Sequence, residues 1–246
     1  SPDGDTLGST LALRLAFLAL GKQADVICDG DMPDNLKYLP GSEAMLHPEN
    51  VNGADYDTAI AVDVSDRSLL GKSEAVFDAA GFRMVIDHHA TNPAFGQANF
   101  IRRGESACCL LAYEAILGLG VEMTKDMGTC LLTGMSTDTG HFQYPATSPA
   151  TLIAAGELLK LGVDISAPDF LNAKEDIGVA LDEGCFPETL TAPQVGRVMA
   201  ATYCRWEQDT FDAYCRRFAL PEKTAFKDYS GTPLRSSVEW NGTSMP

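Results

Sequence analysis

The sequence contains no apolar run long enough to cross a membrane. A membrane helix needs roughly 20 consecutive apolar residues, whereas the most apolar run here, residues 11–20, is interrupted by Arg14. The first residues also show neither the basic segment nor the small-residue cleavage pattern of a secretory signal. We therefore expect a cytoplasmic protein with no membrane partner.

Basic residues are also scarce. Lys and Arg total 18 against 34 Asp and Glu, which gives a formal net charge of −16. A protein that binds along a polynucleotide needs an excess of cations to neutralise the phosphates, so this composition argues against a long nucleic-acid groove. An anionic substrate remains compatible with it if metal ions supply positive charge locally.

Common cysteine, phosphate-binding and nucleophile motifs are absent. The seven cysteines show no C-x-x-C spacing and include one adjacent pair, Cys108 and Cys109, so we expect reduced, buried thiols. There is no glycine-rich phosphate loop with its lysine, no G-x-S-x-G turn and no G-x-G-x-x-G segment after a strand. These absences argue against P-loop, serine-nucleophile and dinucleotide-binding chemistry.

Helical and strand patterns alternate along the chain, which predicts an α/β fold with a mainly parallel sheet flanked by helices. Helices are predicted over residues 7–20, 106–117, 125–135 and 149–161, with Ser106 and Ser148 as N-caps of the second and fourth. Short apolar runs predict strands over residues 23–28, 58–62 and 82–86.

The chain changes character after about residue 164. Prolines then break it into short pieces, and the stretch from residue 229 onward is polar and rich in turn residues. We predict one domain over residues 1–164, a linker over residues 165–185 and a smaller C-terminal α/β region over residues 186–246.

Two aspartates stand directly before the first predicted helix, in the segment Pro2-Asp3-Gly4-Asp5. Gly4 permits a tight turn, so both carboxylates can face one point and bind a divalent metal ion. Alternatively, one aspartate caps the helix and the other belongs to the turn. The residues alone leave both interpretations open.

Polar side chains also end two of the predicted strands. Asp63 follows the second strand, and the segment Asp87-His88-His89 follows the third. The carboxyl ends of parallel strands meet at the edge of the sheet where ligands bind, and a buried carboxylate there needs a cation or donors. Two histidines beside an aspartate offer a metal ligand and a phosphate contact. The pattern therefore predicts a site at this edge.

A fourth acidic segment, Thr137-Asp138-Thr139-Gly140, follows the helix predicted to end near Met135. By itself it is typical of a turn, but it adds a carboxylate to an oxygen-rich set with one imidazole: Asp3, Asp5, Asp63, His88 and Asp138. Such ligands favour Mn²⁺ or Mg²⁺, and the histidine favours Mn²⁺. Two ions about 4 Å apart would form the arrangement that hydrolyses phosphoesters.

These four segments, in this order, resemble the motifs of the DHH phosphoesterase family. The resemblance spans residues 1 to about 163. Gly8-Ser9 and residues 140–144 are most similar to the stand-alone bacterial oligoribonuclease branch, which acts on very short RNAs, linear dinucleotides and 3′-phosphoadenosine 5′-phosphate. The resemblance implies a phosphodiesterase or phosphatase in which two divalent ions, Mn²⁺ before Mg²⁺, activate a hydroxide.

The resemblance also implies a role for each site residue. Five would be metal ligands: Asp3 for the first ion, Asp5, His88 and Asp138 for the second, and Asp63 as a bridge. His89 would face the scissile phosphate as a catalytic residue. Asp87 would support catalysis by orienting the two histidines.

Two family features are missing from the sequence. The family's first motif begins with a metal-binding histidine upstream of the Pro-Asp-Gly-Asp segment, so we expect residues upstream of Ser1. The Gly-Gly-Gly-His motif of the family's C-terminal substrate-binding domain is also missing. Residues 186–246 would therefore be a partial or divergent version of that domain, and no substrate-binding residue is assigned.

Other functions stay open on the sequence. An inorganic pyrophosphatase or polyphosphatase would share the metal site, and a nucleotide-sensing module would keep the fold without turnover. The expected partner is a short RNA or dinucleotide, and a homodimer is compatible with the sequence.

Overall fold

The computed structural model describes residues 2–173, 189–202, 207–217, 220–221 and 223–225. The chain divides into two compact units, Ser1–Ile177 and Gly178–Pro246. The predicted linker contains α6 (Pro168–Asn172) and then runs into residues 174–188, which lie outside the described residues. Much of the predicted C-terminal region also lies outside them.

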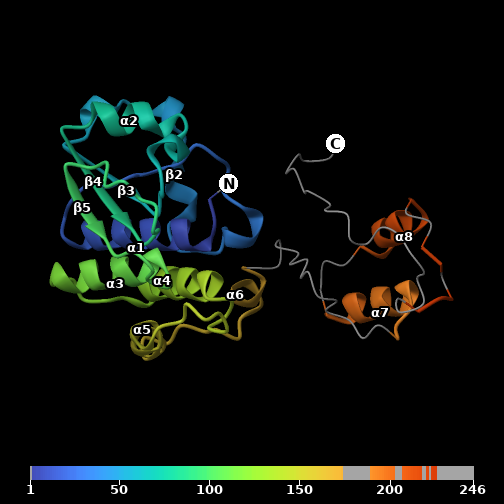
Figure 1. Cartoon of the computed structure of the whole chain (residues 1–246). Coiled ribbons are helices and arrows are strands. Elements are labelled where there is room, and N and C mark those ends of the chain that lie inside the picture. The colour runs from blue at the N-terminus through green and yellow to red at the C-terminus, as the bar shows by residue number, and fades with distance from the viewer. Residues whose placement is uncertain (1, 174–188, 203–206, 218–219, 222, 226–246) are drawn as a thin grey trace. The chain divides into compact units, whose positions relative to one another are not determined.

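The paired strands of the first unit are parallel. β3 (Thr58–Val62), β4 (Phe82–Asp87) and β5 (Ala98–Ile101) form one sheet in that order, and β1 (Val26–Ile27) pairs with β2 (Met45–Leu46). Val62 is in register with Ile86, so β3 and β4 end side by side (Figure 1). The parallel strands and the helices around them confirm the predicted α/β class.

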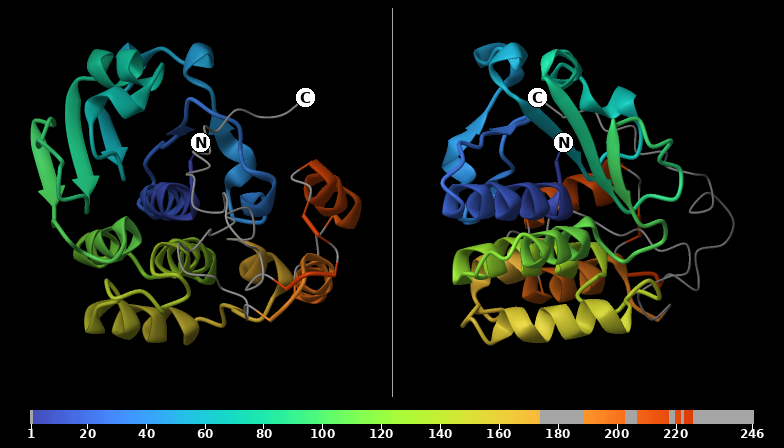
Figure 2. Two further views of the ribbon diagram at one scale, coloured as in Figure 1. Left: turned by 45° about the vertical axis from the view of Figure 1, so that its right-hand side comes forward. Right: turned by 90° about the vertical axis from the view of Figure 1, so that its left-hand side faces the viewer.

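Helices cover both faces of the three-stranded sheet. α1 (Gly4–Ala19), α3 (Cys108–Gly118) and α4 (Lys125–Asp138) pack together on one side, α5 (Pro149–Leu159) covers α3 and α4, and α2 (Ser73–Ala79) lies on the other side (Figures 1 and 2). Side chains alternate along a strand: Val62 and Ile86 join the core with α1, α3 and α4. Ala61 and Val85 contact Phe77 of α2 instead.

Glycines allow α1 and α4 to approach closely. A methyl group on Gly8 would lie 2.4 Å from the backbone oxygen of Cys130, and one on Gly134 would lie 2.9 Å from the Cα atom of Asp5. Because only hydrogen atoms fit there, the helix backbones come together. This approach brings Asp5 on α1 toward Asp138 on α4.

Several helix ends differ from the sequence predictions. α1 begins at Gly4 instead of Leu7, and α5 ends at Leu159 instead of Leu161. α4 continues through Asp138 instead of ending near Met135, and the amide of Thr139 still donates to the carbonyl of Met135 over 3.2 Å. Ser106 is not the N-cap of α3, because Ala107 takes that position and the Ser106 hydroxyl hydrogen-bonds to Thr151 of α5. The predicted Ser148 cap of α5 is confirmed, since its hydroxyl accepts from the amide of Thr151.

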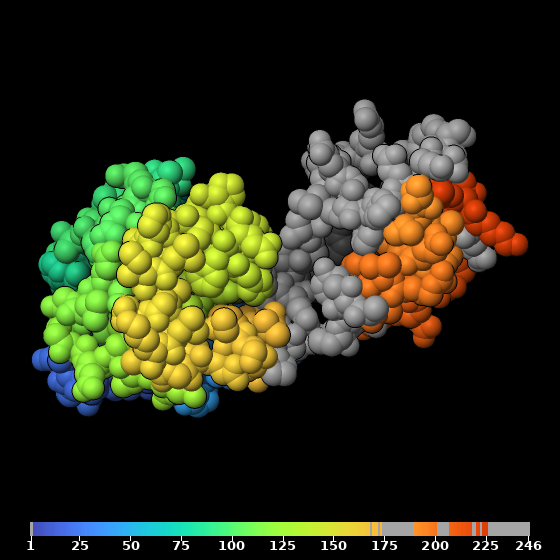
Figure 3. Space-filling model, turned by 90° about the horizontal axis from the view of Figure 1, so that it is seen from below, coloured from blue at the N-terminus to red at the C-terminus, as the bar shows by residue number. Residues whose placement is uncertain are grey.

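Short 3-10 helices occupy the loops of the first unit: η1 (Asp34–Leu36), η2 (Ser42–Ala44), η3 (Pro48–Asn50), η4 (Gly53–Asp55) and η5 (Arg67–Leu70). α5 lies on the outer surface seen in Figure 3 and exposes Leu152 and Ile153.

Within the described part of the chain, no helix is both long enough and apolar enough to traverse a membrane.

The second unit contains α7 (Ala192–Thr202) and α8 (Gln208–Arg217) among its described residues. These two helices pack closely, since a methyl group on Gly196 would lie 2.8 Å from the ring of Phe211. An isolated antiparallel bridge joins Thr191 to Ala225.

Candidate metal centre

Parallel pairing brings the ends of β3 and β4 to one edge of the sheet. Asp63 directly follows β3, and its amide donates to the carbonyl of Ile86 over 2.9 Å. Asp87 is the last residue of β4. Asp63 has a φ of 59°, in the left-handed region. That conformation is uncommon for a residue with a Cβ atom and is often kept at functional sites.

The Asp63 carboxylate is buried, and its two oxygens differ in their contacts. Its side chain is 5% exposed, and Oδ2 accepts a 2.7 Å hydrogen bond from the Thr6 hydroxyl on α1. Oδ1 accepts no hydrogen bond from the residues that the structure describes, although Nε2 of His88 lies 3.4 Å from it. A buried carboxylate oxygen without a donor is costly unless a cation balances it. The atom therefore fits a metal ligand.

Asp5 supplies a second buried carboxylate, from the first turn of α1. Its side chain is fully buried and accepts hydrogen bonds from the amides of Cys108 (2.5 Å) and Cys109 (2.8 Å) at the start of α3. Burial, followed by the negative charges of Asp63 and Asp138, raises the pKa of Asp5 well above its ordinary value. A cation among these carboxylates would relieve that repulsion.

His88 presents one ring nitrogen to the carboxylates and uses the other for support. Its Nδ1 lies 2.8 Å from the carbonyl oxygen of Glu105, an arrangement that metal-binding histidines commonly use to fix the ring. Its Nε2 faces three carboxylate oxygens, at 3.4 Å (Asp63), 3.6 Å (Asp138) and 3.8 Å (Asp5). Burial lowers the pKa of His88, but its contacts with Asp63 and with the carbonyl of Glu105, and the negative charges of Asp5 and Asp63, outweigh burial and raise the pKa to about 10.

Asp138 reaches the cluster from the last turn of α4. Its side chain is 27% exposed, so it borders solvent. Burial, followed by the charges of Asp3 and Asp63, raises its pKa from 3.8 to about 6. The helical placement of Asp138 differs from the predicted turn, but it brings the carboxylate to the predicted set.

Asp3 caps the first helix, which is one of the two interpretations that the sequence left open. Its Oδ1 accepts from the amides of Asp5 (3.1 Å) and Thr6 (2.9 Å), so it is the N-cap of α1. Asp3 is exposed and belongs to neither metal-binding group of the described residues. It is still close enough to raise the pKa of Asp138.

Asp87 and His89 form a separate hydrogen-bonded pair beside the carboxylates. Asp87 is fully buried, and its Oδ1 accepts from Nδ1 of His89 over 2.7 Å. The same Nδ1 lies 3.7 Å from Oδ1 of Asp63. The His89 side chain is 42% exposed, so Asp87 holds a histidine that reaches solvent at the edge of the cluster.

Two overlapping groups in the described residues have the geometry to hold a metal ion. One contains Asp63, His88 and His89, and the other contains Asp5, His88 and Asp138. Within each group the ligand atoms lie within 4.8 Å of one another. Oxygen-rich sets with an imidazole suit hard or borderline divalent ions. The chemistry of the donors thus agrees with a divalent metal centre.

Sequence reasoning missed two side chains that support the cluster. Thr6 donates to Asp63 across 57 residues of sequence, and Asn92 donates to Oδ2 of Asp87 over 2.6 Å. The sequence did not single out either residue, because threonine in the first turn of a helix and asparagine in a loop are both common. The one available indication was that each lies close in sequence to an aspartate of a predicted motif.

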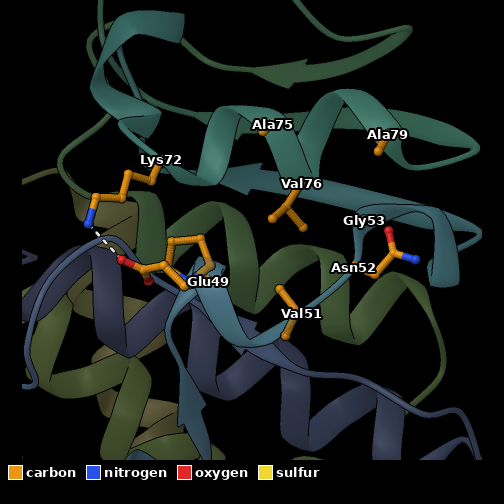
Figure 4. A pocket seen from close by; sticks show the side chains of 9 residues that line it. Glu49, Val51, Asn52, Gly53, Lys72, Ala75, Val76 and Ala79 are labelled. Carbon is orange, nitrogen blue, oxygen red and sulfur yellow. Dashed lines mark hydrogen bonds and ion pairs between the residues drawn. The ribbon is translucent and has the colours of Figure 1, made fainter.

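A pocket elsewhere in the first unit shares no residue with the cluster. It has a volume of about 330 Å³ and lies between α2 and residues 48–53 (Figure 4). Lys72 and Glu49 at its rim form a 2.6 Å ion pair, and the remaining lining residues are Pro48, Val51, Asn52, Gly53, Ala75, Val76 and Ala79. Its polar rim is therefore already paired.

The fold and the cluster define an α/β protein with a candidate divalent metal centre at the carboxyl edge of a parallel sheet. Residues 1–135 match the model of the DHH family, N-terminal domain. The chain belongs to the DHH family, as its four acidic segments predicted.

Comparison with known proteins gives three informative likenesses. The chain is 38% identical over 167 residues to the "Bifunctional oligoribonuclease and PAP phosphatase NrnA" of Thermus thermophilus, covering 67% of this chain and 49% of that protein. It is 24% identical over 211 residues to the "Probable manganese-dependent inorganic pyrophosphatase" of Streptococcus mutans, covering 82% and 64%. The crystal structure of an exopolyphosphatase-related protein from Bacteroides fragilis shares the fold, with a TM-score of 0.67, 24% identity and coverages of 86% and 65%. The chain spans about half the length of the NrnA relatives it matches.

Proposed function

We propose that this chain is the metal-binding part of a phosphoesterase that hydrolyses short oligonucleotides, linear dinucleotides or 3′-phosphoadenosine 5′-phosphate. The observation that carries the proposal is the buried Oδ1 of Asp63, which accepts no hydrogen bond from the described residues and lies among His88 and two further acidic side chains. The names of the NrnA relatives, oligoribonuclease and PAP phosphatase, support the choice of substrate.

Two divalent ions, Mn²⁺ in preference to Mg²⁺, would be held by the carboxylates and imidazole of Asp5, Asp63, His88 and Asp138. Asp3, which also caps α1 beside the cluster, would be a further ligand. When bound, such ions acidify water and neutralise charge on the phosphate oxygens. The name of the Streptococcus mutans relative supports manganese. The contacts of Asp63 support its role as the shared ligand, since Thr6 fixes one oxygen and leaves the other toward the cluster.

His89 would contact the scissile phosphate. Its Nδ1 is engaged by Asp87, so its Nε2 is the atom left to contact a phosphate oxygen. Because Nδ1 already carries the proton bound to Asp87, Nε2 donates a hydrogen bond to the charge that develops there when the ring holds a second proton. Asp87 would fix the tautomer and the ring orientation of His89. His89 is partly exposed, which allows a substrate to approach it.

Short substrates suit the charge of this chain better than long ones. The net charge of −16 offers no extended attraction for a polynucleotide, whereas a dinucleotide or a nucleotide monophosphate requires cations at only one or two phosphates.

We also propose residues 1–164 as the catalytic domain, residues 165–185 as a linker and residues 186–246 as part of a substrate-binding region.

The test is mononucleotide release from a 5′-phosphorylated diadenylate in Mn²⁺, with pyrophosphate assayed in parallel. Asp63→Ala removes the shared ligand and is expected to abolish release. Asp66→Ala is the matched control, because Asp66 only caps η5 in an exposed position. Phosphate release from pyrophosphate alone would make the chain a pyrophosphatase. Absence of both activities, with nucleotide still bound, would make it a nucleotide-sensing module.

A further inference from the structure

Asn92 is a buried asparagine whose amide is fully used. It lies in the loop after β4 and is 1% exposed. Its Nδ2 donates to Oδ2 of Asp87 over 2.6 Å and to the carbonyl of Val64 over 2.9 Å, and its Oδ1 accepts from the amide of Ala94 over 2.8 Å. Both N–H groups and the carbonyl are therefore paired, which fixes the side chain in one orientation.

This amide completes the hydrogen bonding of Asp87. The carboxylate is fully buried, and its two oxygens have one side-chain donor each: His89 for Oδ1 and Asn92 for Oδ2. Without Asn92, Oδ2 would lose a buried donor, which costs far more than an exposed hydrogen bond. The carboxylate would then turn toward another donor, and the direction of the His89 hydrogen bond would change with it.

The backbone of the loop that carries Asn92 is also held by hydrogen bonds from Arg103. Nη2 of Arg103 donates to the carbonyl of Asn92 over 2.9 Å, and Nε of Arg103 donates to the carbonyl of Ala90 over 3.2 Å. Val64, whose carbonyl accepts the hydrogen bond from Nδ2 of Asn92, directly follows Asp63 in the sequence. Asn92 is thus held between the ends of β3 and β4 and has no freedom to follow a moving Asp87.

We propose that Asn92 is a positioning residue for phosphoester hydrolysis: by holding Asp87, it keeps the ring of His89 in the tautomer and orientation that direct Nε2 toward the substrate phosphate. This inference rests on the proposed function. Asn92 touches no substrate itself and acts through Asp87 and His89. Its loss is therefore expected to impair turnover and to leave substrate affinity nearly intact.

Asn92→Asp is the principal test, because it keeps the size of the side chain and replaces the donor to Asp87 with a carboxylate. Loss of such a supporting contact typically costs about 10- to 100-fold in activity, and we expect that loss in kcat for the diadenylate, with KM changed less than twofold. Asn99→Asp is the matched control. Asn99 is exposed, and its side-chain amide hydrogen-bonds to the backbone of its neighbour Gly96, so kcat should be unchanged.

A double-mutant cycle separates positioning from general support of the fold. If Asn92 acts through His89, adding Asn92→Asp to His89→Ala should lower the residual kcat by less than twofold. An equal loss in both backgrounds would overturn the inference. Long-range ¹⁵N NMR of the metal-free protein gives a readout without turnover: we expect one His89 tautomer, protonated at Nδ1, in the wild type, and a mixture in Asn92→Asp.

If Asn92→Asp does not fold, the cycle is repeated with Asn92→Ala. If neither variant folds, Asn92 serves stability alone and the inference is wrong. A wild-type protein that hydrolyses the diadenylate while Asn92→Asp retains full kcat would refute this inference and leave the proposed function standing. A wild-type protein inactive on the diadenylate would instead refute the proposed function and, with it, this role of Asn92.

Discussion

The Cα atom of Asp5 on α1 lies so close to Gly134 on α4 that a methyl group at position 134 would come within 2.9 Å of it. The same methyl group would lie 2.3 Å from the Sγ atom of Cys109. One glycine thus sets the spacing between two helices and leaves room for the Asp5 carboxylate to reach the start of α3. The contact at Gly134 therefore affects both the packing of α1 against α4 and the position of Asp5 in the candidate metal centre.

Gly134→Ala is therefore expected to destabilise the protein. Extra carbon in a packed core typically costs about 1–3 kcal/mol, and here the neighbours are a helix backbone and a buried thiol. Gly156→Ala on α5 is the control, since a methyl group there meets nothing within 4 Å and alanine stabilises a helix interior by about 0.5–1 kcal/mol relative to glycine. Urea unfolding measures both changes. Equal stability of the two variants would show that α1 and α4 are not in close contact.

Binding of Mn²⁺ is expected to stabilise the folded state through Asp63. A ligand at 100 times its Kd adds about 2.7 kcal/mol, so the melting temperature should rise with Mn²⁺ concentration. Asp63→Asn removes the negative charge and should abolish the rise. Asp66→Asn should preserve it, because asparagine caps a helix as well as aspartate does and Asp66 is an exposed cap. A full Mn²⁺ shift in Asp63→Asn would exclude Asp63 as a ligand.

Two strands were predictable from sequence because burial on both faces leaves a continuous apolar run. β3 has the predicted bounds, and β4 extends the predicted run by one residue, Asp87. β2, β5 and α2 were not predicted, because each is short and only partly buried. The strand predicted over residues 23–28 was too long, since β1 contains only Val26 and Ile27. α4 was predicted to end too early, since Thr137 and Asp138 favour turns. Packing against α1 carries the helix past them.

The residue types of the candidate site were also predictable, whereas their partners were not. Aspartates and histidines at the ends of buried strands and helices indicate a site, because burying charged groups costs free energy unless a cation or a donor pairs with them. The bond from Cys108 to Asp5 joins residues 103 positions apart, and that from Thr6 to Asp63 joins residues 57 apart. Such contacts depend on how helices pack, and no local pattern encodes them. The predicted cap of α3, Ser106, is replaced in this way by a carboxylate from another helix.

Thiol reactivity should follow burial along the chain. Cys108, Cys109 and Cys130 are buried, whereas Cys28 and Cys215 are partly exposed. Burial, with nearby carboxylates, raises the pKa of Cys108 and Cys109 well above its ordinary value, and the thiolate is the reactive form. Brief alkylation at pH 8, followed by peptide mass spectrometry, should label Cys28 and Cys215 before the three buried thiols. Alkylation in urea should label all seven cysteines of the sequence, and early labelling of Cys108 in the native protein would contradict the packing of α3.

Affinity for Mn²⁺ should rise with pH, because the ion competes with protons on its ligands. Asp138 has its pKa raised to about 6 and His88 to about 10, so both hold protons more tightly in the metal-free folded state than in the unfolded chain. The stability that these protons contribute is lost as pH rises through 6 for Asp138 and through 10 for His88. Between pH 6 and 8, displacing the proton of His88 should tighten Kd at least about tenfold per pH unit, because Asp5, whose pKa is also raised, adds to the protons displaced.

Below pH 6 the dependence should become steeper, because Mn²⁺ must then displace a further proton, from Asp138. Calorimetric titrations at pH 5, 6, 7 and 8 measure the slope, and repetition in buffers of different ionisation enthalpy counts the protons released. Asp138→Asn should remove the added steepness below pH 6 while leaving the slope between pH 6 and 8. A Kd that is constant from pH 5 to 8 would mean that neither His88 nor Asp138 contacts the ion, since a ligand that must lose a proton cannot bind independently of pH.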